Sequence, residues 1–107
     1  MSTAKLDDPI LKRFRAALDA LYGDRIERVV LFGSRARGDA REDSDYDIAV
    51  FLHDLTDYWR EADRMVDLET DILLDTGAVI NGLIFPAEAY GARTVFMNEV
   101  RLDGLDL

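Results

Sequence analysis

Four residues in the first half of the chain carry groups that could do chemistry together. Gly33 and Ser34 follow the apolar run 29–32, and after ten further residues Asp45 and Asp47 open a second apolar run. A glycine after a buried strand lets the backbone approach a ligand closely, and a serine at a helix start offers phosphate a hydroxyl and an amide. Gly33 and Ser34 are therefore the candidate phosphate-binding residues.

The two aspartates form a candidate metal site. In a strand, residues i and i+2 share one face with Cα atoms about 6.6 Å apart, so Asp45 and Asp47 can both reach one divalent ion. Mg²⁺ favours such carboxylates together with substrate phosphates. Alone, a Gly-Ser pair is commonly a turn and an Asp-x-Asp a solvated strand end. The functional interpretation therefore depends on the two motifs occurring together, each beside a buried strand.

Hydrophobic spacing predicts the elements that must position these residues. It predicts helices over 9–22, 57–74 and 93–101, and residues 34–38 could begin a short helix. Strands are predicted over 28–32, 45–52 and 78–85. In the second strand, Asp47, Ala49 and Phe51 should point to one face and the residues between them to the other. The order predicts an α+β fold, a small mixed β-sheet packed on one side by helices, with its strand order left open.

Length and composition limit the function further. The 107 residues suit a single domain, 1–107, with 49% hydrophobic and 33% charged residues. A net charge of −9 disfavours bulk nucleic-acid binding, and the absence of cysteine leaves oxygen ligands for any metal. No apolar run approaches the length that spans a bilayer, so we expect no membrane association and a cytoplasmic protein.

The pattern of Gly33 and Ser34, ten residues, then Asp45 and Asp47 resembles the signature of the minimal nucleotidyltransferase (MNT) family in the DNA polymerase β-like superfamily. The resemblance extends over nearly the whole chain. It implies a core like the palm of polymerase β, ATP bound by Gly33, Ser34 and Arg35, and catalytic Mg²⁺ held by Asp45 and Asp47. Family members commonly act as antitoxins of HEPN-domain ribonuclease toxins, and some transfer AMP to a toxin tyrosine.

One departure from the superfamily pattern bears on activity. The superfamily usually places a third carboxylate on the strand after the long helix, whereas the only polar side chain in that predicted strand is Asn81. An amide oxygen ligates metal weakly and cannot act as a base. Glu69, Asp71 and Asp75 are the nearest acids, and we interpret them as solvated helix charges rather than substitutes.

Three functions therefore stay open. The first is a metal-dependent transferase that moves AMP from ATP to a hydroxyl, with tyrosine expected, of a partner HEPN-type toxin. The second is an antitoxin with weak or no catalysis that masks its toxin by binding, and the third is a nucleotide sensor. Among other residues, His53 is interpreted as a surface histidine, and Arg35, Arg37 and Arg41 either contact the phosphates or an acidic partner, or simply keep a loop soluble.

Overall fold

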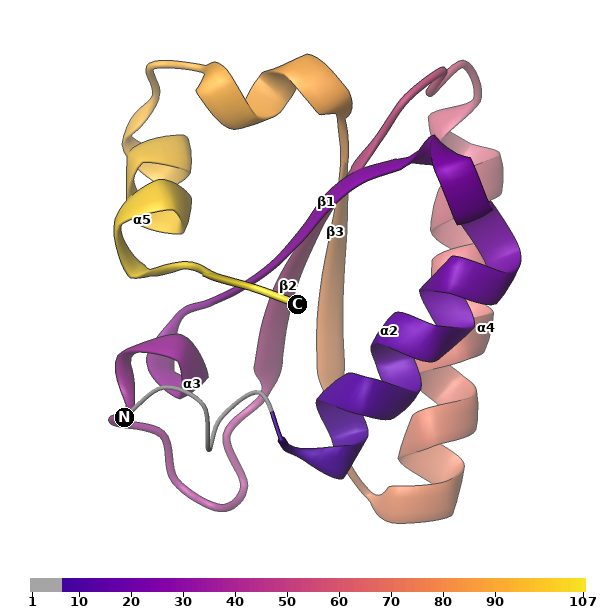
Figure 1. Cartoon of the computed structure of the whole chain (residues 1–107). Coiled ribbons are helices and arrows are strands. Elements are labelled where there is room, and N and C mark those ends of the chain that lie inside the picture. The colour runs from indigo at the N-terminus through magenta and orange to yellow at the C-terminus, as the bar shows by residue number, and fades with distance from the viewer. Residues whose placement is uncertain (1–6) are drawn as a thin grey trace.

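The computed structural model describes residues 7–107 as a four-stranded sheet with helices on both faces (Figure 1). Its helices are α2 (Pro9–Tyr22), α3 (Ser34–Arg37), α4 (Tyr58–Thr76) and α5 (Val95–Asp103), with the 3₁₀ turns η1 (Gly23–Arg25) and η2 (Ala87–Gly91). Its strands are β1 (Ile26–Phe32), β2 (Tyr46–Leu52), β3 (Ile80–Pro86) and β4 (Leu105–Asp106). Within residues 7–107, no helix combines the length and the apolar character needed to cross a membrane.

Capping residues mark the ends of the two long helices. At the start of α2, the Asp8 carboxylate accepts a hydrogen bond of 2.8 Å from the Ile10 amide. The carboxylate of Asp57 likewise accepts from the Arg60 amide, 3.1 Å away, at the start of α4. Gly77 ends α4 with φ of 79°, a left-handed conformation that glycine adopts without strain. The predicted helices are confirmed to within about two residues at each end.

The strand order, which the sequence left open, is β3-β2-β1-β4. β1 pairs with β2 and β4 in antiparallel fashion, and β2 pairs with β3 in parallel. Two register pairs matter for the site, Phe32 with Asp47 and Asp47 with Asn81. The ends of the three main strands therefore bring the glycine after β1, the second aspartate and Asn81 to one place.

The sheet has a hydrophobic core on each face. On one face, α2 and α4 lie side by side and cover alternate residues of β2, among them Ile48, Val50 and Leu52 (Figure 1). On the opposite face, α5 and η2 cover a smaller cluster that contains Ala49 and Phe51. The predicted alternation of β2 is confirmed, but the expectation of helices on one side only is wrong, because Ala49 and Phe51 are fully buried and need their own cover.

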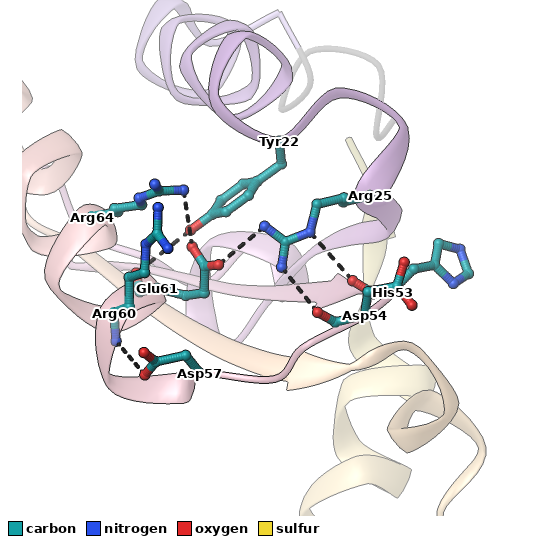
Figure 2. Close-up of polar contacts among 8 residues, drawn as sticks. All are labelled: Tyr22, Arg25, His53, Asp54, Asp57, Arg60, Glu61 and Arg64. Carbon is teal, nitrogen blue, oxygen red and sulfur yellow. Dashed lines mark hydrogen bonds and ion pairs between the residues drawn. The ribbon is translucent and has the colours of Figure 1, made fainter.

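A buried ionic cluster closes the end of the sheet where β1 begins and β2 ends (Figure 2). The Glu61 carboxylate is almost fully buried and lies 3.0 Å from the Arg25 guanidinium and 3.6 Å from that of Arg64. Arg25 also donates to the carbonyl oxygen of Asp54, at 3.3 Å, in the loop after β2. Burial and the charge of Glu61 raise the pKa of Tyr22 to about 12. The cluster ties the start of α4 to the start of β1 and has a structural role.

Candidate active site

Gly33 and the Asp47 carboxylate lie against each other at the end of the β1–β2 pair. Gly33 has φ of 76° and ψ of −158°, a conformation that is nearly exclusive to glycine. A Cβ atom at this position would stand 2.5 Å from Oδ2 of Asp47 and 3.3 Å from its Cγ. Only glycine therefore allows the turn into α3 to pass this close to the carboxylate. The two halves of the sequence pattern meet here through the pairing of β1 with β2.

The two predicted metal ligands lie at the start of β2. Asp45 directly precedes the strand and is exposed, and Asp47, within it, is half-buried. Oδ1 of Asp47 accepts a hydrogen bond of 3.3 Å from the Asn81 side-chain amide. Across residues 7–107, no group of three or more histidine or acidic side chains gathers to hold a metal. The Asp47 carboxylate beside the glycine turn, with Asp45 two residues before it, offers oxygen ligands of the kind that Mg²⁺ takes together with substrate phosphates and water.

Arg35 holds the loop that leads to Asp45. Its guanidinium donates to the carbonyl oxygens of Ser44, at 2.9 Å, and Glu42, at 3.0 Å. It also stacks 3.9 Å from the centre of the Tyr46 ring. These contacts give Arg35 a positioning role, and its predicted contact with phosphate stays a prediction. Ser34 begins α3 directly after Gly33, and its predicted contact with the triphosphate also stays a prediction.

Tyr46, between the two aspartates, faces the opposite side of the sheet from Asp47. It is buried in the core under α2, and its hydroxyl donates to Oδ2 of Asp8 at 2.6 Å. Burial, followed by the hydrogen bond to Asp8, raises the pKa of Tyr46 to about 12. Tyr46 therefore packs in the core and does not face the site.

The other arginines of the loop are exposed. Arg37 pairs with Asp39 at 3.3 Å and with Asp103 at 3.4 Å, so it links the loop to the end of α5. The Arg41 side chain makes no ion pair within the described residues. Arg35, Arg37 and Arg41 therefore differ in their contacts, a difference that the sequence alone did not show.

Glu69 is not the solvated charge that the sequence suggested. It is half-buried, and its carboxylate accepts a hydrogen bond of 2.8 Å from the backbone amide of Gly82. Burial raises its pKa above the ordinary 4.5. Because Gly82 lies between Ile80 and Ile84 of the core under α4, Glu69 is on the face opposite to Asp47 and cannot replace a third carboxylate there.

The remaining titratable candidates lie away from the site. Asp71 is exposed, and Asp75 pairs with Arg13 at 2.8 Å, so both are surface charges as predicted. His53 is half-exposed at the far end of β2 and lies 2.9 Å from the carboxylate of Glu27. None of these three side chains reaches Asp47.

Two features of the site were not visible in the sequence. The contact between Asn81 and Asp47 depends on the pairing of β2 with β3, which periodicity does not reveal. Phe96 of α5 packs edge-on against Phe32, with ring centres 5.5 Å apart, and so covers the strand end next to Gly33. An apolar helix predicted near the end of the chain was the signal for Phe96, but its place on the sheet was not predictable.

Comparisons with known proteins agree with this geometry. A family model described as "Polymerase beta, Nucleotidyltransferase" matches residues 19–88. Two proteins of Methanocaldococcus jannaschii, each named "Putative protein adenylyltransferase", are similar to the chain. One is 37% identical over 87 residues, covering 81% of both chains. The other is 28% identical over 98 residues, covering 92% of this chain and 95% of the relative.

Solved structures share the fold. A toxin-antitoxin with AMP-PNP has a TM-score of 0.61 and 22% identity, covering 87% of this chain and 68% of that chain. A mutant of the toxin-antitoxin MntA-HpeT has a TM-score of 0.63 and 19% identity, covering 89% and 69%. The matched residues 19–88 include the glycine turn, both aspartates and Asn81. The chain therefore belongs to the polymerase β family of nucleotidyltransferases.

Proposed function

We propose that this chain transfers AMP from ATP to a hydroxyl of a HEPN-type toxin, with tyrosine as the expected acceptor, and thereby acts as an antitoxin. The observation that carries the proposal is the contact between Gly33 and Asp47, because it joins a candidate phosphate-binding turn to a candidate metal ligand. The names of the Methanocaldococcus jannaschii relatives support protein adenylylation, and the toxin-antitoxin structures support a toxin partner.

The proposed reaction has a simple balance of bonds. The acceptor oxygen forms a bond to the α-phosphorus of ATP, the bond from that phosphorus to the bridging oxygen breaks, and pyrophosphate leaves. Mg²⁺ bound by Asp45 and Asp47 would neutralise charge on the triphosphate. Gly33 and Ser34 would orient the phosphates through backbone amides and a hydroxyl. The hydroxyl proton passes to water or to a base of the partner, because the Asn81 amide cannot accept it.

One specific observation favours the two alternative functions. Asn81 occupies the strand position beside Asp47 and donates a hydrogen bond to it, so this side of the site lacks a carboxylate base. An antitoxin that masks its toxin by binding would not need a carboxylate at this position. A nucleotide sensor, which binds ATP without transferring AMP, would not need one either.

The test is transfer of label from α-labelled ATP with Mg²⁺ to a purified HEPN-domain toxin. We expect labelled toxin with the unchanged chain and none with the Asp45→Ala/Asp47→Ala variant. A matched control, Asp39→Ala/Asp43→Ala, removes two exposed acids of the same loop and should keep the activity. Toxin that is neutralised without label would favour masking, and ATP binding with neither transfer nor neutralisation would favour the sensor.

A further inference from the structure

An apolar stripe runs along the outer side of α4. Trp59, Val66 and Leu73 follow one another at seven-residue intervals, which places them on one side of the helix with a drift of about 20° per step. Their exposed fractions are 76%, 54% and 43%. Exposed apolar residues are ordinary when scattered, whereas three that are aligned on one side of a helix offer a surface that a partner can cover.

The Leu73 end of the stripe lies beside one edge of the sheet. β3 is the edge strand on this side of the sheet, and a hollow of about 170 Å³ between it and α4 is lined by Leu73, Val79 and Ile80, among others. The edge amide of Gly82 is already bonded to the Glu69 carboxylate. A partner strand would have to compete for this donor, so the edge favours a helical partner over a pairing strand.

Two exposed acidic side chains lie beside the stripe. Asp63 and Asp67 are exposed at i and i+4, a like-charge spacing that destabilises an isolated helix. Neither makes an ion pair among residues 7–107, and the neighbouring Arg64 pairs with Glu61 instead. A second copy of this surface would bring like charges together, whereas a basic partner would neutralise them.

We propose that this surface, formed by Trp59, Val66, Leu73, Asp63 and Asp67, binds an amphipathic helix of a partner protein. The helix lays an apolar seam on the stripe and places Lys or Arg side chains against the two aspartates. The proposal rests on the proposed function only in assuming a protein partner. It locates the binding surface on α4, on the face of the sheet opposite to Asp47.

The chain supplies its own probe, because Trp59 is its single tryptophan. The partner is represented by a synthetic peptide of roughly three heptads, with Leu at the a and d positions and Lys at the flanking positions. We expect a saturable blue shift of the Trp59 emission with this peptide. A scrambled peptide of the same composition and a peptide with Glu in place of Lys should give none.

Variants of the chain test the assignment to α4. Val66→Asp and Asp63→Lys/Asp67→Lys should each weaken binding of the Lys peptide by about tenfold or more, and the charge reversal should gain affinity for the Glu peptide. Leu102→Asp is the control, because Leu102 is 85% exposed on α5, on the other face of the sheet. It should bind like the unchanged chain.

Several results would overturn the proposal. An equal shift with the scrambled peptide would mean unspecific charge attraction, and no shift would mean no helix-binding surface. A blue shift of the chain alone that grows with its concentration would assign the stripe to self-association. The Asp45→Ala/Asp47→Ala variant should bind the peptide normally, so failure of AMP transfer and failure of this inference are separable.

Discussion

Replacing Gly33 by alanine tests whether the turn and the Asp47 carboxylate form one unit. Alanine would have to adopt φ of 76° and ψ of −158°, and its Cβ would lie 2.5 Å from Oδ2 of Asp47. The backbone strain costs about 1–3 kcal/mol. That corresponds to a fall in Tm of roughly 5–20 °C for a domain of this size. The carboxylate must also move to relieve the contact.

Displacement of the carboxylate should affect function beyond stability. A shift of about 1 Å in a catalytic group can lower the rate by about a hundredfold. We expect Gly33→Ala to fold, to bind Mn²⁺ more weakly in a titration followed by paramagnetic line broadening, and to lose about that factor in AMP transfer. Thermal unfolding followed by circular dichroism measures the separate effect on stability.

Gly77→Ala is the matched control for Gly33→Ala. Gly77 also has a positive φ, of 79°, but a Cβ there would meet nothing within 4 Å. It should cost about 1–2 kcal/mol of stability and leave metal binding unchanged. If Gly33→Ala lost no more stability than Gly77→Ala and bound Mn²⁺ normally, the reasoning about the Gly33–Asp47 contact would be refuted.

Three further changes have defined outcomes. Asn81→Asp places a carboxylate beside Asp47 and should raise the rate of AMP transfer by about a hundredfold in the α-labelled ATP assay. The variant should also be less stable, because the two carboxylates repel each other. An unchanged rate would show that the missing base does not limit transfer. Glu69 has a raised pKa, so the folded state binds its proton more tightly and stability falls as pH rises from about 4.5. Glu69→Gln should therefore be more stable than the unchanged chain in urea unfolding at pH 7, with the advantage vanishing at low pH; a lower stability at pH 7 would contradict this. Arg35→Lys loses the planar fork that binds two loop carbonyls, so it should cost about 1–2 kcal/mol and speed limited proteolysis within residues 38–45; unchanged proteolysis would refute the positioning role.

Much of the fold followed from local patterns in the sequence. The helix over 9–22 was predicted with the bounds that the structure shows, because Pro9 and Gly23 mark its two ends. The alternation along β2 was predictable because period-two spacing is a local property. β4 was not predicted, because two residues carry no periodicity and form a strand only through pairing with β1.

The features that the sequence did not predict all depend on contacts between residues that are distant in the chain. Ala49 and Phe51 are apolar, so their face of the sheet needed a helix to cover it. The prediction of helices on one side only, which came from the order of the elements, did not take this into account. The burial of Glu69 depends on its bond to Gly82, thirteen residues away. For the site itself, the motif residues were predictable, whereas the bond between Asn81 and Asp47 required the strand order.

The pairing of β1 with β2 has a consequence for how the site forms during folding. Gly33 and Asp47 meet through an antiparallel pair joined by residues 33–45, which include α3, and this connection is about half as long as the one over residues 53–79 that joins β2 to β3. We expect Asn81 to join them later, because β3 follows α4 in the chain and its parallel pairing with β2 is a less local contact. In pulse-labelled hydrogen exchange, amides of the β1–β2 pair should gain protection before those of β3. The turn and its two aspartates would then be assembled before the strand that carries Asn81 arrives.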